Sequence, residues 1–162
     1  GWPTEAGSAA LAGFKALEDA AVVERLSGAG AVLIGSTAMS EFGFGLKGSQ
    51  AGCALGKKSA DVELMLDMAG EARLAAAREG VCGFKPSYGL ISRIGLVGLI
   101  PSMESCGILA RDIKSIREIL KTIAGPDERD FSLSAEMIPD VSAQEIDPAK
   151  TTLGIIPDVV ND

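Results

Sequence analysis

The spacing of apolar residues predicts two amphipathic helices. Over residues 112–125, isoleucine and leucine recur every three or four positions, which places them on one face of a helix that Gly125 can end. Residues 19–30 have the same spacing, with Asp19 as the expected N-terminal cap and a glycine as the stop. Each segment therefore has an apolar face to pack against a core.

Other apolar patterns predict strands. Residues 61–68 alternate between apolar and mostly polar positions, which is the period of a strand. Residues 31–35 and 106–110 are short continuous apolar runs, as in strands buried on both faces. Residues 151–158 are expected to form a closing strand.

The segment around residue 70 has two interpretations. A strand at 61–68 followed by a helix at 70–79 is the prediction, and a single helix over 60–79 is the alternative, because leucine, methionine and glutamate also favour helices. A short helix is expected at 36–42. Helices and strands thus mix along the chain, which predicts an α/β fold with a mixed central sheet flanked by helices.

Two polar segments interrupt these elements. Residues 43–60 are rich in glycine and small polar residues and are expected to form a long loop, at an apparent internal deletion. Residues 126–150 form a polar connector. The length of 162 residues suits one domain, here taken as residues 1–162.

Composition excludes several function classes. Lys and Arg number 15 against 22 Asp and Glu, and the net charge of −7 argues against direct nucleic-acid binding. Hydrophobic residues make up 47%, yet no apolar run approaches the roughly 18 residues of a membrane span, and no signal peptide is visible. Three widely spaced cysteines suggest buried thiols in a cytoplasmic protein, and the chain contains no histidine. No metal site or cofactor is expected, and any catalysis has to proceed without imidazole.

Four segments carry a recognisable pattern: "PTEAGS" at 3–8, residues 19–45, the run from "GFKPSYG" to "AGPDERD" at 83–130, and "TTLGIIPD" at 151–158. Together they resemble the amidase signature family, and within it the A subunits of glutamyl-tRNA(Gln) amidotransferases. The resemblance implies a reduced version of the amidase-signature fold. It also implies amide hydrolysis by a Ser–cis-Ser–Lys triad, with backbone N–H donors from a glycine-rich loop for the oxyanion.

The chain departs from this pattern at every member of the triad. The family's lysine lies just upstream of the segment that resembles residues 1–8, and Gly1 suggests that an upstream segment could be missing. The run that carries the bridging serine is expected near residues 51–56, where it is shortened and replaced. The triad is therefore not found.

The nucleophile position is occupied by a glutamate. The family's run Asp-Thr-Gly-Gly-Ser, followed after one residue by Arg, aligns with residues 67–73 when counted back from residue 83. Asp67, Gly70 and Arg73 are retained, and Glu71 stands at the serine position. We therefore predict that these four residues line a degenerate site, with Glu71 in the first turn of a helix, at the family's anion site.

Three functions remain open. A degenerate amidase-like domain without hydrolysis would serve as a binding or assembly module, its apolar surface covered by a homo-oligomer or a protein partner. Alternatively, the chain is an amidase or part of an amidotransferase that hydrolyses a glutamine-type primary amide, with its missing triad residues supplied elsewhere. The third alternative is a binder of a small amide or amino acid.

Overall fold

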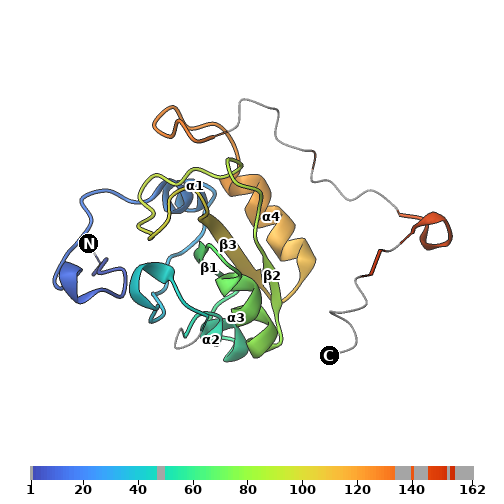
Figure 1. Cartoon of the computed structure of the whole chain (residues 1–162), viewed down its shortest axis with the longest axis horizontal. Helices are drawn as coiled ribbons and strands as arrows, with labels where there is room; N and C mark the ends of the chain where they lie inside the picture. Colours follow the sequence, from blue (N-terminus) through green and yellow to red (C-terminus); the bar gives the residue numbers. More distant parts are fainter. Residues whose placement is uncertain (1, 47–49, 134–139, 141–145, 153, 156–162) are drawn as a thin grey trace.

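A three-stranded antiparallel sheet forms the centre of the fold, with helices packed on its two faces (Figure 1). The computed structural model describes residues 2–46, 50–133, 140, 146–152 and 154–155. The strands are β1 (Val62–Asp67), β2 (Cys82–Phe84) and β3 (Ser105–Ala110), in the order β1-β3-β2. The predicted α/β class is confirmed, and the strand pairs of the described part are antiparallel.

The central strand, β3, is buried on both faces. Cys106, Ile108 and Ala110 point into one apolar cluster, shared with α1 (Ala21–Gly28) and α4 (Ile113–Ile123). Leu109 points the other way, into a cluster with α2 (Cys53–Gly56) and α3 (Glu71–Glu79). Alternate side chains of an extended strand face opposite sides, so one strand supplies both halves of the core. The predicted buried strand at 106–110 is confirmed.

Both predicted amphipathic helices form. In α4, Ile116, Leu120 and Ile123 are buried in the core, and the Asp112 carboxylate caps the helix by accepting the Ser115 backbone N–H at 2.7 Å. The predicted Asp19 cap of α1 is wrong. This helix starts after Ala20 without a side-chain cap, and the Ala21 N–H instead donates to the Ile94 carbonyl at 3.0 Å.

Helix α3 packs unusually close to the sheet because both surfaces are made of small residues. A Cβ built on Gly107 of β3 would lie 2.5 Å from the Ala72 Cβ, and one on Gly83 of β2 would lie 2.6 Å from the Ala76 Cβ. These separations leave no room for a methyl group. The strand-then-helix interpretation is confirmed over the single helix, and α3 ends at Gly80, which has a left-handed φ of 67°.

The predicted strand at 31–35 is wrong. These residues lie outside any helix or strand, and Val32, Leu33 and Ile34 are 81%, 56% and 63% exposed. An apolar run becomes a strand only where a neighbouring strand accepts its backbone hydrogen bonds. In the part of the chain that the structure describes, no strand pairs with this segment.

The remaining expectations hold in part. The helix predicted at 36–42 is reduced to a 3-10 turn, Glu41–Gly43, and the expected loop at 43–60 contains α2. Two further 3-10 turns span Ala9–Leu11 and Pro148–Lys150. Within 151–158, residues 151, 152, 154 and 155 are exposed and form no strand, and the others lie outside the described residues.

Candidate functional site

The turn between β1 and α3 is organised by a buried carboxylate, Asp67. Its side chain is fully buried and accepts the backbone N–H of Gly70 at 2.8 Å and of Ala72 at 3.1 Å. Arg73 adds two bonds, from Nε at 3.2 Å and Nη2 at 3.0 Å. Gly70 has a φ of 127°, which favours glycine, so the chain can reverse here without strain.

The Glu71 side chain folds back over this turn. Its Oε2 atom accepts the backbone N–H groups of Met68, Ala69 and Gly70 at 2.9, 2.8 and 3.1 Å. Its Oε1 atom faces the N–H of Gly45 at 3.5 Å, from the segment that follows the 3-10 turn at 41–43. Glu71 is 4% exposed. We call these four backbone N–H groups, of Gly45 and residues 68–70, the amide cradle.

The turn therefore brings together all four residues predicted from the sequence. The connection between β1 and α3 contains all of them: Asp67, Gly70, Glu71 and Arg73. The carboxylates of Asp67 and Glu71 both accept the Gly70 N–H, and their other backbone donors differ. The contribution of Gly45 was not predicted. A glycine-rich segment carries no side-chain signal for which of its N–H groups faces a distant carboxylate.

Comparison with known proteins identifies the family. The family model described as "Amidase" matches residues 1–57 and 51–161. The chain belongs to the amidase family. It is 41% identical over 149 residues to the A subunit of the glutamyl-tRNA(Gln) amidotransferase of Natronomonas pharaonis, and the match covers 78% of this chain and 35% of the relative.

Solved amidase-family structures share the fold. The A subunit of the Thermotoga maritima glutamyl-tRNA(Gln) amidotransferase superposes with a TM-score of 0.77 at 27% identity, over 85% of this chain and 35% of that one. A protein described in connection with a vestigial complex and the origins of an s-triazine catabolic enzyme gives a TM-score of 0.80 at 31% identity, over 86% and 35%. This chain thus spans about a third of the length of these relatives.

The amide cradle sets the charge of Glu71 in this amidase-family chain. Burial alone would raise the pKa of the carboxyl, but the bonds from the backbone N–H groups of Ala69, Met68 and Gly45 outweigh it, and the pKa of Glu71 lies below its usual value. The hydrogen bonds from Arg73 to Asp67 raise the pKa of the guanidinium. Glu71 is therefore a carboxylate at neutral pH, held by backbone dipoles.

A second acidic residue on β1, Glu63, ties down the segment before the strand. Its carboxylate accepts the Thr37 hydroxyl and, at 2.9 Å, the Gly52 backbone N–H. The alternation of residues 61–68 placed Glu63 on the polar face but could not indicate these partners. Glu63 thus holds Thr37 and Gly52 against β1.

The polar network beyond α4 is structural. Arg129 pairs with Asp127 at 3.0 Å and with Glu24 of α1 at 2.8 Å, and Asp130 accepts the Arg93 backbone N–H at 2.7 Å. The Arg129 guanidinium holds the pKa of Asp127 well below its usual range. These contacts fasten the loop after α4 to α1 and to the backbone at Arg93.

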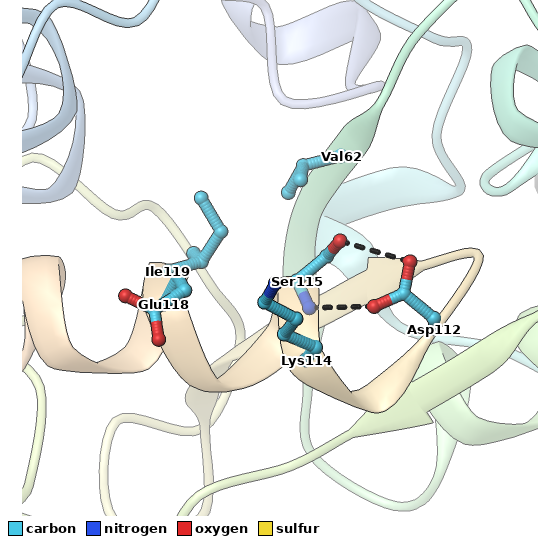
Figure 2. Close-up of a pocket in the computed structure, with 6 residues that line it drawn as sticks. All are labelled: Val62, Asp112, Lys114, Ser115, Glu118 and Ile119. Atoms are coloured by element: carbon cyan, nitrogen blue, oxygen red, sulfur yellow. Dashed lines mark hydrogen bonds between the residues drawn. The ribbon is translucent and has the colours of Figure 1, made fainter.

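A surface hollow of about 430 Å³ lies at the opposite end of β1 from the amide cradle (Figure 2). Its lining combines Val62 with residues of α4 and its cap: Asp112, Lys114, Ser115, Glu118 and Ile119. Figure 2 shows Asp112 joined by two hydrogen bonds to Ser115, from the backbone N–H and the hydroxyl. The carboxylate is thus committed to capping α4, and we assign no chemistry to this hollow.

Metal clusters and membrane-spanning helices are both absent from the described ranges. No group of three or more Cys, Asp or Glu side chains in these ranges is arranged to hold a metal ion. Among the helices of these same residues, none is long and apolar enough to cross a membrane.

Proposed function

We propose that this chain is an amidase-family domain that does not hydrolyse amides and acts as a binding or assembly module. The observation that carries the proposal is the Glu71 carboxylate, which accepts three backbone N–H groups. We align Glu71 with the serine of the family pattern by counting back from residue 83. Glutamate offers no hydroxyl to attack an amide carbonyl.

Electrostatics supports the same conclusion. Amide hydrolysis passes through a tetrahedral oxyanion that needs preorganised N–H donors. Here the donors of residues 68–70 are occupied by Glu71, and its negative charge would repel a second anion at the same place. A substrate carbonyl therefore has neither a nucleophile nor free donors at this turn.

Exposed apolar residues support the assembly role. Val32, Leu33 and Ile34 form a continuous exposed apolar segment, with half-exposed Phe44 and Trp2 elsewhere in the N-terminal third. Exposed apolar patches commonly mark interaction surfaces. The similar proteins include a subunit of an amidotransferase and a protein described with a vestigial complex, and both descriptions point to assembly with other chains.

Ammonia release from primary amides, including glutamine and asparagine, tests the proposed inactivity. The wild-type chain should release none above background and should not react with a fluorophosphonate, which labels activated serines. An active amidase measured in parallel validates the assay. Release by the wild type that Glu71→Ala abolishes would refute the proposal and assign a new amide chemistry to Glu71.

Light scattering at micromolar concentration tests the assembly role separately. Self-association, or a stable complex with another protein of an amidotransferase, is the expected result. A wild-type chain that stays monomeric and also fails to bind such a protein would remove the assembly role while leaving inactivity unaffected.

The second candidate function is that of a part of an amidotransferase. The missing triad residues would then come from another segment or chain. The 41% identity to an amidotransferase protein favours it. Glutamine-dependent ammonia release that appears only when partner proteins are added would establish it.

A further inference from the structure

We propose that residues 31–35 form the contact between two copies of this chain, which pair here as antiparallel strands centred on Leu33. The inference deepens the proposed assembly role and rests on it, because it names the surface and the partner. It does not depend on whether the chain hydrolyses amides.

The backbone of this segment is available for pairing. In the part of the chain that the structure describes, no hydrogen bond reaches the backbone N–H or carbonyl groups of residues 32–36, and these residues lie outside any helix or strand. The anchor before them is Ala31, whose N–H donates to the Leu26 carbonyl at 2.9 Å. A strand from another chain can supply the missing partners, as in complexes formed by β-strand addition.

The order of side chains in the segment is nearly symmetrical about Leu33. In an antiparallel pair centred there, Leu33 faces its own copy, Val32 faces Ile34, and Ala31 faces Gly35. The β-branched side chains, which favour strands, thus meet each other, and the small residues meet each other. A two-fold dimer requires this kind of contact, in which the same residues serve both copies. The pattern therefore favours a second copy over an unrelated strand.

The charges around the segment favour the same arrangement. Residues 26–40 contain no Asp, Glu, Lys or Arg, so two copies of a chain with a net charge of −7 can meet here without bringing like charges into contact. They also lack the charged side chains that commonly prevent strands from pairing at an edge. The nearest charged residues are Arg25 before the segment and Glu41 after it. An antiparallel copy places the basic flank of one chain near the acidic flank of the other, whereas a parallel copy would bring like flanks together.

The exposed apolar area predicts a weak, reversible dimer. A fully exposed aliphatic side chain offers about 60–120 Å² of apolar surface, so the exposed fractions of Val32, Leu33 and Ile34 correspond to roughly 120–240 Å² per copy. Trp2 enlarges this surface, because a Cβ built on Gly35 would lie 3.9 Å from its half-exposed ring. Interfaces that bury less than about 1,200 Å² in total are typical of transient complexes. We therefore expect association at high micromolar concentration.

Analytical ultracentrifugation from about 5 to 500 µM tests the proposal, since this range covers a weak dimer. Wild type should change from monomer to dimer as its concentration rises. Leu33→Lys and Leu33→Glu should each weaken the dimer at least about ten-fold, because the new charge meets its own copy at the two-fold axis. An equimolar mixture of the two variants should regain the dimer, since unlike charges then face each other. Leu17→Lys changes a leucine that is 99% exposed and lies outside the segment, and this matched control should dimerise like wild type.

Three results would overturn the proposal: a wild type that stays monomeric up to about 500 µM, a dimer that Leu33→Lys leaves intact, or a mixture of the two variants that associates no better than either alone. If a Leu33 variant does not fold, hydrogen exchange of wild type decides. The amides of residues 32–34 should exchange more slowly at high than at low protein concentration, and equal rates would overturn the proposal.

These outcomes separate the failure of this inference from the failure of the proposed function. A wild-type dimer that the Leu33 variants do not weaken removes residues 31–35 as the contact and leaves the assembly role standing. A monomer that binds another protein of an amidotransferase does the same. Ammonia release tests the proposed inactivity and is independent of both.

Discussion

Replacing Glu71 with glutamine measures how much the amide cradle contributes to stability. The amide oxygen can occupy the position of Oε2, so three hydrogen bonds persist but become neutral. The change from a charged to a neutral acceptor removes about 1 kcal/mol per bond, or about 3 kcal/mol for the three. The easier burial of a neutral group offsets about 1 kcal/mol of this. We expect Glu71→Gln to lower the free energy of unfolding by about 2 kcal/mol at pH 7.

The same variant predicts a pH dependence with a definite sign. The pKa of Glu71 in the folded chain lies below its ordinary value of 4.5, so the unfolded chain takes up a proton first as the pH falls. A lowered carboxyl pKa stabilises the fold above the unfolded pKa, and this stabilisation is lost as the pH falls through the folded value. The difference in free energy of unfolding between wild type and Glu71→Gln should therefore be constant from pH 6 to 8, because this interval lies well above the pKa of Glu71 in both the folded and the unfolded chain. The difference should shrink below about pH 4.5.

Urea denaturation followed by circular dichroism at several pH values measures both the loss of stability at pH 7 and its dependence on pH. Glu18→Gln, at an exposed glutamate outside any helix or strand, serves as the matched control and should change the free energy of unfolding by less than about 0.5 kcal/mol. A Glu71→Gln variant as stable as wild type at pH 7, or a difference that grows toward low pH, would refute the assignment of Glu71 as a carboxylate held by N–H donors.

Three further results are expected elsewhere in the fold. Gly107→Ala should destabilise the chain by about 1–3 kcal/mol in urea denaturation, since the new methyl meets the Ala72 Cβ at 2.5 Å, and adding Ala72→Gly should make the two effects less than additive. Arg25→Met should lower the melting temperature, because Arg25 donates to three backbone carbonyls at and after the end of α4. Lys114→Met, at an exposed position of α4, should leave the melting temperature nearly unchanged. Cys106 should resist iodoacetamide at pH 8 until the chain unfolds, since burial raises the pKa of its thiol to about 12. Mass spectrometry should find alkylation first at the two partly buried cysteines, Cys53 and Cys82, and early labelling of Cys106 would contradict its buried placement.

Segments whose side chains alone specify an element were predictable from the sequence. The apolar stripe of α4 and the continuous apolar run of β3 each form as expected, because their burial follows from period and composition. The alternating run at 61–68 also forms a strand, although its helix propensity favoured the alternative. Gly107 and Gly83 explain the outcome, since they allow α3 to pack closely on the neighbouring strands.

Features that depend on distant backbone were not predictable. Residues 31–35 have the composition of a buried strand but lie exposed, because pairing depends on a neighbour that a local pattern cannot reveal. The candidate turn shows the same division. Its four residues could be placed by alignment, whereas the N–H group of Gly45 and the direction of the Glu71 side chain follow from the fold.

The order of the strands affects how this chain folds while it is being synthesised. The central strand, β3, comes last in the sequence, and the two strands that flank it, β1 and β2, pair with it and with no other described strand. A nascent chain that has not yet extended beyond residue 110 therefore holds two strands with unpaired edges. Such edges are prone to aggregate. Ribosome pausing before β3 is available should thus expose the chain to chaperones, whereas β3, once available, pairs with both β1 and β2.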